Sequence, residues 1–245
     1  MTQQLIYNVE GESLVHKQAV ASARKAFKFS TRLLLTGVLW AGVTVQVFAA
    51  DAALQAGQYD ALMLAITPDR QLQGYYSETL GGGVTRHCAF YLQGRIQGEA
   101  PVPVTTWSSE AYPGSVTATA DGVELTVERG REHAGCVSVL MPEITTGLAL
   151  SRYANKPWIG LVSITADKAY LQKHPGDKVA KGPYIVKGDV LGVLAYQAGW
   201  ARVEFINDDG RSFTGWVRED QYKRPMLREG LASEEAGAGR AAVAP

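Results

Sequence analysis

The chain has 245 residues, of which 46% are hydrophobic and 20% are charged, a composition typical of globular domains and not of disordered chains. At a domain size of roughly 100–200 residues, this length accommodates one or two domains. The 24 Lys and Arg residues balance the 24 Asp and Glu residues, which excludes the strong basic field of a nucleic-acid-binding protein. The two cysteines exclude a disulfide-dense miniprotein and a zinc site of four cysteines.

Residues 1–49 have the order of a secretory signal peptide. Several Lys and Arg residues precede an apolar run from Leu33 to Val43, and small residues follow it. Cleavage after Ala49 would place Val47 and Ala49 at the −3 and −1 positions. The run is shorter than the ~20 apolar residues of a membrane span, which favours a cleaved signal over an anchor. We therefore expect a periplasmic or secreted protein that has no membrane association after cleavage.

The first 23 residues are unusual for a signal peptide, because they are polar and include Glu10 and Glu12. A start codon assigned too far upstream would explain them, with the true start near Val15 or Val20. Removal of the signal leaves 19 basic and 22 acidic residues, so we expect a slightly acidic mature chain.

Residues 50–155 are predicted to form a β-rich domain, whose clearest element is a hairpin around Asp121-Gly122. Alternating apolar residues flank this dipeptide in Ser115–Ala120 and Val123–Glu128. Asp-Gly between alternating runs is the strongest short signal for a two-residue type I′ turn. In the register that follows, Val123, Leu125 and Val127 lie opposite Ala120, Ala118 and Val116.

A second hairpin is expected around Pro68-Asp69, a dipeptide suited to a turn, between Leu62–Thr67 and Leu72–Tyr76. Short strands at regular spacing predict a small antiparallel barrel or sandwich. Further strands of this domain are expected at Cys88–Gln93, Val102–Thr106 and Gly147–Arg152.

Four aromatic residues of this domain have two interpretations. They line a ligand cavity, or they pack in the core and cover the surface, which is the commoner fate of aromatic side chains. The sequence alone does not assign them to a site. They are Tyr75, Tyr76, Tyr91 and Trp107.

The two cysteines, Cys88 and Cys136, both follow the signal. Export into an oxidising compartment predicts a disulfide between them. A metal site that also includes His87 and His133 is the alternative, but adjacent side chains on a strand point to opposite faces, so His87 and Cys88 lack ordinary zinc-ligand spacing. We therefore expect the disulfide, no metal and no cofactor.

A catalytic interpretation rests on the segment His133–Val137. It is similar to the Ser-His-Gly-Cys-Val-Arg motif of L,D-transpeptidases, which use a cysteine nucleophile on peptidoglycan. Three departures weaken the resemblance: Ala134 is inserted between His and Gly, Ser138 replaces the arginine, and no His-Gly pair lies upstream. The resemblance therefore supports an enzyme only as an alternative.

Residues 156–225 are predicted to form a second domain of about five short strands with tight turns. Three motifs, Lys-Gly-Asp, Trp-x-x-Val and Gly-Trp-Val, occur in order within Tyr184–Val190, Gly199–Val203 and Thr214–Val217. By these motifs the segment resembles a bacterial SH3-like domain. The resemblance implies a small, partly open β-barrel, and members of this family bind cell-wall peptides or proteins.

The resemblance also implies an aromatic ligand groove on this domain. Strand alternation over residues 200–206 turns Ala201, Val203 and Phe205 inward and leaves Trp200 on the opposite face. Residues 226–245 contain no aromatic residue and are expected to be a disordered tail. The candidates for the groove are Trp200, Tyr170, Tyr184 and Tyr222.

The sequence thus predicts an exported all-β protein in which a disulfide-tied antiparallel barrel or sandwich precedes an SH3-like barrel. Its expected function is recognition, without catalysis, of a peptidoglycan peptide or of a protein partner, as in an inhibitor or immunity protein. The alternative function is a cell-wall hydrolase or transpeptidase with an SH3-like targeting module. A small hydrophobic ligand inside the first barrel is a third hypothesis, and no nucleic-acid partner is expected.

Overall fold

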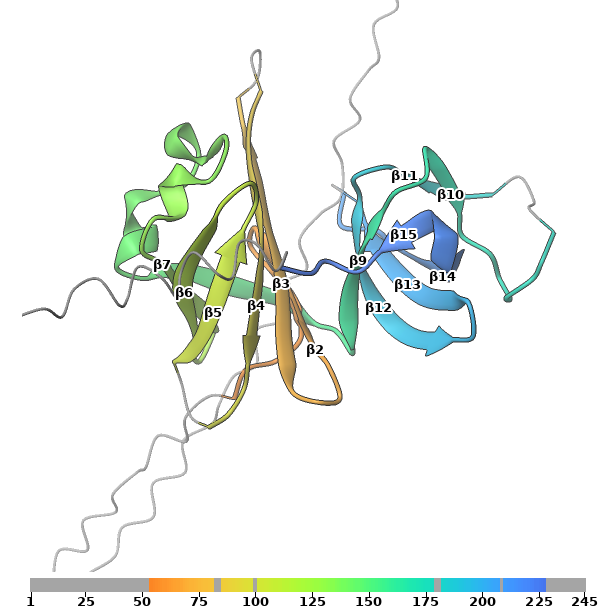
Figure 1. Ribbon diagram of the computed structural model, residues 1–245, viewed down its shortest axis with the longest axis horizontal. Helices are drawn as coiled ribbons and strands as arrows, with labels where there is room; N and C mark the ends of the chain where they lie inside the picture. The colour runs from red at the N-terminus through yellow and green to blue at the C-terminus, as the bar shows by residue number, and fades with distance from the viewer. Residues whose placement is uncertain (1–52, 82–84, 99–100, 179–181, 208, 228–245) are drawn as a thin grey trace, which may run out of the picture. The chain divides into compact units, whose positions relative to one another are not determined.

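The computed structural model describes residues 53–81, 85–98, 101–178, 182–207 and 209–227, all within one compact unit of the chain. These residues form an all-β structure: a closed eight-stranded barrel followed by a five-stranded curled half-barrel (Figure 1). The expected signal at residues 1–49 and most of the expected tail lie outside the described residues. Within the described part, no helix has the length and apolar character needed to cross a membrane.

Eight antiparallel strands form the barrel. Each strand pairs with the next one in sequence, and β8 closes the barrel against β1. Closure leaves the sheet without a free edge, which protects it from pairing with other chains. The strands are β1 (Gly57–Tyr59), β2 (Leu62–Ile66), β3 (Gln71–Leu80), β4 (Arg86–Arg95), β5 (Val102–Trp107), β6 (Ala111–Ala118), β7 (Gly122–Val127) and β8 (Leu148–Asn155).

Side chains fill the interior of the barrel. Alternation along β3, for example, buries Leu72 and Tyr76 inside and leaves Gln73 and Tyr75 half-buried outside. Inner residues of all eight strands form one apolar cluster, as expected for a barrel of this size. The interior of the barrel is thus packed with the protein's own side chains, which disfavours the hypothesis that it binds a hydrophobic ligand there. Three 3₁₀ helices complete this core between β7 and β8: η1 (Gly130–Glu132), η2 (Cys136–Ser138) and η3 (Pro142–Thr145).

The predicted Cys88–Cys136 disulfide is confirmed. Its S–S distance is 1.98 Å and its Cα–Cα distance is 4.4 Å, and it joins β4 to η2 within the barrel core. Gly135 precedes the second cysteine with a φ of 81°, and a Cβ there would lie 2.2 Å from the carbonyl oxygen of His87. Glycine therefore permits both the left-handed backbone and the close approach that the bridge requires.

The hairpin predicted around Asp121-Gly122 forms, but its predicted register and turn type are wrong. Ala118 pairs with Val123, so the turn residues are Ala120 and Asp121. A type I′ turn needs a positive φ at both turn residues, and neither residue has one. Gly122 instead lies in β7 against β8, where a Cβ would come within 2.0 Å of a backbone oxygen.

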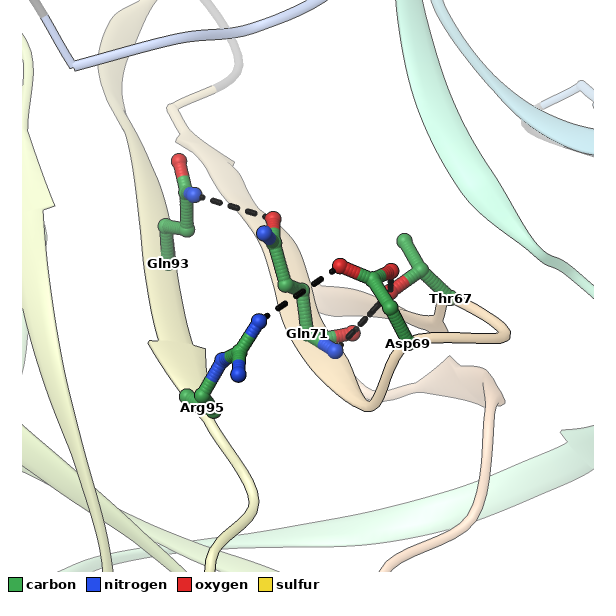
Figure 2. Close-up of polar contacts among 5 residues, drawn as sticks. All are labelled: Thr67, Asp69, Gln71, Gln93 and Arg95. Atoms are coloured by element: carbon green, nitrogen blue, oxygen red, sulfur yellow. Dashed lines mark hydrogen bonds and ion pairs between the residues drawn. The ribbon is translucent and has the colours of Figure 1, made fainter.

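The second predicted hairpin joins β2 to β3, and side chains fix its turn (Figure 2). The Thr67 hydroxyl donates to an Asp69 carboxylate oxygen at 2.6 Å and accepts from the backbone N–H of Gln71 at 2.8 Å. The side chain of Gln93 on β4 donates to that of Gln71 at 3.2 Å. Arg95 Nη2 lies 3.7 Å from Asp69, so the turn is tied to the neighbouring strand.

The half-barrel has the strand order β14-β13-β12-β9-β15, and a two-stranded ribbon, β10-β11, belongs to the same part of the chain. Its buried residues, among them Ala201 and Val203 as predicted, form a second apolar cluster. The elements are β9 (Gly160–Ile164), β10 (Lys168–Tyr170), β11 (Tyr184–Val186), β12 (Val190–Gln197), β13 (Trp200–Ile206), β14 (Ser212–Arg218), η4 (Glu219–Gln221) and β15 (Tyr222–Lys223).

A third apolar cluster attaches the half-barrel to the barrel. It combines Ala65 of β2 with Trp158, Leu161 and Val190. Trp158 is 1% exposed, and a Cβ at Gly192 would lie 2.2 Å from its indole, so glycine makes room for the ring. Two hydrogen bonds reinforce the contact: Ile66 N–H to the Trp158 carbonyl at 3.2 Å, and Leu161 N–H to the Gln73 side chain at 3.0 Å.

The indole of Trp158 is held by a buried carboxylate. Glu204 Oε2 accepts from Trp158 Nε1 at 2.8 Å, and Oε1 accepts from Lys156 Nζ at 2.6 Å and from the Ser212 hydroxyl. Burial raises the pKa of Glu204, but the hydrogen bonds from Lys156, Ser212 and Trp158 lower it more, so the net pKa is below its ordinary value. Glu204 therefore stays ionised at neutral pH although it is only 6% exposed.

Reduction of the disulfide should lower the free energy of unfolding by about 4 kcal/mol, because the bridge constrains a long loop of the unfolded chain. Urea unfolding with and without reductant, followed by circular dichroism, measures the change. A double Cys88→Ala, Cys136→Ala variant is the control, since reductant should leave its midpoint unchanged. An unchanged midpoint in the wild type, with loss of the bridge verified by mass spectrometry, would contradict the prediction.

Glu204→Ala should lower the free energy of unfolding by about 3–5 kcal/mol, because it leaves the Lys156 ammonium and the Trp158 N–H without their buried partner. Chemical denaturation measures the loss. Glu219→Ala removes an exposed carboxylate from the same half-barrel and should stay within about 0.5 kcal/mol of wild type. Equal unfolding midpoints for the two variants would show that the buried carboxylate does not stabilise the attachment.

Candidate functional site

The outer wall of the barrel carries three aromatic side chains at one level. The register pairs Tyr75 on β3 with Tyr91 on β4, and Tyr91 with Trp107 on β5. Ring centroids are 4.9 Å apart for the first pair and 5.8 Å apart for the second. Direct cross-strand pairing thus assembles a continuous surface of Tyr75, Tyr91 and Trp107, which we call the aromatic row.

The structure places the four aromatic residues that the sequence left unassigned on two different faces of the barrel sheet. Tyr76 points into the barrel, where it stacks on Phe90 with a centroid distance of 4.9 Å. Its three companions point outward because they occupy the opposite phase of their strands. One member of the set is therefore a residue of the barrel core. The other three lie on the outer wall, where Trp107 is only 6% exposed and Tyr75 and Tyr91 are half-buried against the third apolar cluster.

The aromatic row lines a hollow of about 840 Å³, which we call the aromatic groove. Its other side is the chain segment from Lys223 to Met226, which begins with the last residue of β15. Lys223 is paired with Ser163 of β9, and the Arg224 guanidinium lies 4.3 Å from the ring centroid of Tyr196. The two walls of the groove thus come from the barrel and from the half-barrel.

The described lining of the groove is apolar, hydroxylated and basic. Its charged residues are Lys223 and Arg224, and within the described part of the chain neither forms an ion pair with a carboxylate. Burial raises the pKa of the Tyr75 and Tyr91 hydroxyls, which therefore remain neutral donors at physiological pH. A ligand with a flat apolar group and a carboxylate matches this surface.

The residues predicted for the SH3-like groove form two pairs. Tyr170 and Tyr184 meet on the β10-β11 ribbon with a centroid distance of 5.8 Å. Trp200 and Tyr222 line another hollow of about 320 Å³, which shares Arg224 with the aromatic groove. Tyr222 is only 8% exposed and belongs to the core of the half-barrel, so most of its ring serves packing.

The two basic residues of the groove were missed by the sequence analysis. Lys223 and Arg224 close the predicted second domain and precede Pro225, and nothing in their local pattern distinguishes them from solvated surface charges. For the aromatic row, by contrast, the alternation of apolar and polar residues along β3, β4 and β5 indicates that its three side chains lie on the outer face of the barrel. The registers that align the three rings could not be read from the sequence.

His133 of the transpeptidase-like segment is buried in the barrel. Its ring stacks on Phe90 with centroids 4.6 Å apart, and its Nε2 lies 2.9 Å from the hydroxyl oxygen of Thr106. That hydroxyl donates to the Tyr112 carbonyl, so it accepts from Nε2–H, and Nδ1 then accepts from the Ser108 hydroxyl at 3.1 Å. Burial lowers the pKa of His133 to about 4, against a smaller opposing effect of Glu110, so the ring is neutral at pH 7.

The described residues do not offer the groups that a cysteine enzyme or a metal site needs. The sulfur atoms of Cys88 and Cys136 form the disulfide, so among the described residues there is no free thiol for nucleophilic attack. Among the described residues, no group of three or more potential metal ligands converges. What the site offers is a shaped surface with aromatic, hydroxyl and cationic groups.

Comparisons with known proteins found no similar protein. No family model matches the chain, and no curated protein or solved structure matches it.

Stability should fall as the pH is lowered from 7 to 5, because of His133. A histidine in the unfolded chain titrates near ~6.5, whereas burial holds His133 at about 4 in the folded protein. The unfolded chain then takes up a proton that the folded protein does not, which costs about 2 kcal/mol by pH 5.

Chemical denaturation at several pH values tests this dependence. His133→Gln should remove most of the slope between pH 7 and pH 5. His174→Gln changes an exposed ring and leaves His133 in place, so the slope should persist. A slope that is the same in wild type and His133→Gln would assign the dependence to other groups.

Proposed function

We propose that this protein is an exported, non-catalytic recognition protein that binds a peptide of the cell envelope in the aromatic groove. The peptide belongs to peptidoglycan or to a protein partner. The observation that carries the proposal is the aromatic row, three adjacent rings that line a groove opposite Lys223 and Arg224. Concave sites with aromatic walls and a few placed polar groups are the usual form of ligand sites.

Export is supported by two features. The basic-then-apolar order of residues 1–49 is that of a secretory signal. The buried disulfide fits an oxidising compartment, where such bonds persist. Together they favour a periplasmic or secreted location, in which cell-wall peptides and envelope proteins are the available partners.

We further propose that the half-barrel is a bacterial SH3-like domain. The three motifs fall on its strands and turns, and the glycines in them have structural reasons. Gly188 in Lys-Gly-Asp and Gly199 before Trp200 have φ values of 97° and 73°. Gly215 in Gly-Trp-Val pairs with Val203, and a Cβ there would lie 2.7 Å from the Cβ of Leu171.

Recognition is favoured over the enzyme alternative by the state of the segment His133–Val137. A cysteine enzyme needs a thiolate beside a base. Here Cys136 is bonded to Cys88, and His133 is enclosed among Phe90, Tyr112 and Thr106. The segment instead completes the core at one end of the barrel.

The test is binding of the full mature chain to purified peptidoglycan sacculi and to soluble muropeptides, measured by co-sedimentation and by calorimetry. Trp107→Ala should weaken binding roughly 30-fold, the usual cost of removing an aromatic anchor. Because Trp107 is only 6% exposed, a second variant, Lys223→Gln, tests the same groove through an exposed side chain. Arg224 is left unchanged because it lines the hollow of Trp200 as well.

Trp200→Ala is the matched control, since Trp200 lines the other hollow. If Trp200→Ala abolishes binding and the groove variants bind normally, the site is the predicted SH3-like surface and the aromatic groove is the wrong assignment. If sacculi and muropeptides do not bind, the same variants are compared in cross-linking to periplasmic proteins. A cross-link pattern unchanged by all groove variants would reject the proposal.

A further inference from the structure

The aromatic groove adjoins a second hollow of about 770 Å³ on the same barrel wall. Tyr75 lines both hollows. Ser77 lines the second hollow and Ala89 the first, and these two residues are directly paired across β3 and β4. Paired residues lie only about 5 Å apart, so the two hollows meet along this part of the wall.

The wall between the hollows is partly covered by the half-barrel. The register pairs Met63 on β2 with Tyr75, at the same level as the aromatic row. Met63, Tyr75 and Tyr91 pack against the cluster of Trp158, Leu161 and Val190. The two hollows therefore meet beside this contact, at the paired Ser77 and Ala89. Large exposed side chains mark the two ends: Tyr153, 74% exposed, lines the second hollow, and Met226, 71% exposed, lines the first.

The charges of the two hollows are opposite. Lys223 and Arg224 lie at the groove end, whereas Asp60 and Asp209 line the second hollow. Lys156 also lines the second hollow, but its ammonium is paired with Glu204 at 2.6 Å. Asp209 lies 3.9 Å from Arg211 Nη2 at the exposed surface, so among the described residues Asp60 is the acid of this hollow without an ion pair. The cleft therefore has a basic pole and an acidic pole with apolar and aromatic residues between them.

We propose that the two hollows form one cleft that binds an extended dipolar peptide, with its carboxylates at Lys223 and Arg224 and its amino groups at Asp60 and Asp209. This inference rests on the proposed function and specifies its ligand. Charge complementarity selects the ligand, because the two aspartates repel an all-acidic peptide and the two cations repel an all-basic peptide.

The geometry of the sheet sets the length of this peptide. Neighbouring strands are about 4.8 Å apart, so the level from β2 to β5 spans roughly 14 Å. An extended chain covers about 3.3 Å per residue, so four or five residues span the same distance along the line where the hollows meet. One or two charged residues at each end then reach the poles, which gives a peptide of about seven residues.

The test uses synthetic heptapeptides and calorimetry with the full mature chain. All share a central Phe-Ala-Ala-Ala-Phe. The dipolar peptide has one lysine at one end and one glutamate at the other and is made in both chain orders; the comparison peptides have a glutamate at each end or a lysine at each end. The better dipolar peptide should bind the wild type at least tenfold more tightly than either comparison peptide.

Reversal of each pole should change the preferred peptide. In Lys223→Glu with Arg224→Glu, the preferred ligand should be the all-lysine peptide. In Asp60→Asn with Asp209→Lys, the preferred ligand should be the all-glutamate peptide. Asp60→Asn is chosen because its side-chain oxygen can still accept from Ser151 N–H. Lys173→Glu with Glu143→Lys alters exposed charges outside both hollows and should leave the ranking unchanged.

The outcomes separate this inference from the proposed function. If all peptides bind within threefold of one another, or if either reversal leaves the ranking unchanged, the dipolar cleft is wrong. Loss of that residual binding in Trp107→Ala would still support the aromatic groove. If no peptide binds the wild type, the dipolar cleft is rejected, and the muropeptide and cross-linking results decide the proposed function independently.

Discussion

The attachment of the half-barrel to the barrel depends on one buried indole and the carboxylate that holds it. Trp158 lies just after β8 and is packed against Leu161, Val190 and the backbone of Gly192. An indole N–H buried without an acceptor is costly, and an unpaired buried carboxylate costs more. Glu204 and Trp158 satisfy each other, and Lys156 supplies the compensating charge. The candidate cleft has one wall from each β unit, so its shape depends on this contact.

Closure of the barrel is the second constraint on the site. Because the interior has room only for side chains, every strand must send one phase of its residues inward and the other outward. Tyr76 and Phe90 fill the interior, and their neighbours Tyr75 and Tyr91 are thereby turned to the outer wall. The row of rings on the outer surface is thus a consequence of how the core is packed.

Local pattern predicted the features that depend on neighbours in sequence. The two hairpins, the strand phases and the disulfide followed from turn dipeptides, alternation and the even cysteine count. The position of the Asp121-Gly122 turn was predicted wrongly, because Gly122 is needed for its close contact with β8 and not for a positive φ. A contact between strands outweighed the local turn preference.

The features that could not be predicted depend on contacts between distant segments. Glu204 alternates with core residues of β13, a pattern typical of a solvated surface acid. It is buried because Lys156 and Trp158, more than forty residues earlier in the chain, cover that face. Likewise, Lys223 and Arg224 become groove residues only because β15 pairs with β9 beside Tyr91. No single segment carries the information that brings these residues together.

A cleft with walls from two β units links recognition to the stability of their attachment. A ligand that contacts the barrel wall and the segment after β15 binds only the attached arrangement, so binding stabilises that arrangement by mass action. The converse also holds, because any change that populates a detached state lowers the apparent affinity by the fraction detached. The buried Glu204 network thus sets how preorganised the cleft is, because it holds Trp158 in the cluster against which Tyr75 and Tyr91 pack. Preorganisation reduces the entropy lost on binding, which gives a structural reason for a charged network at an otherwise apolar contact.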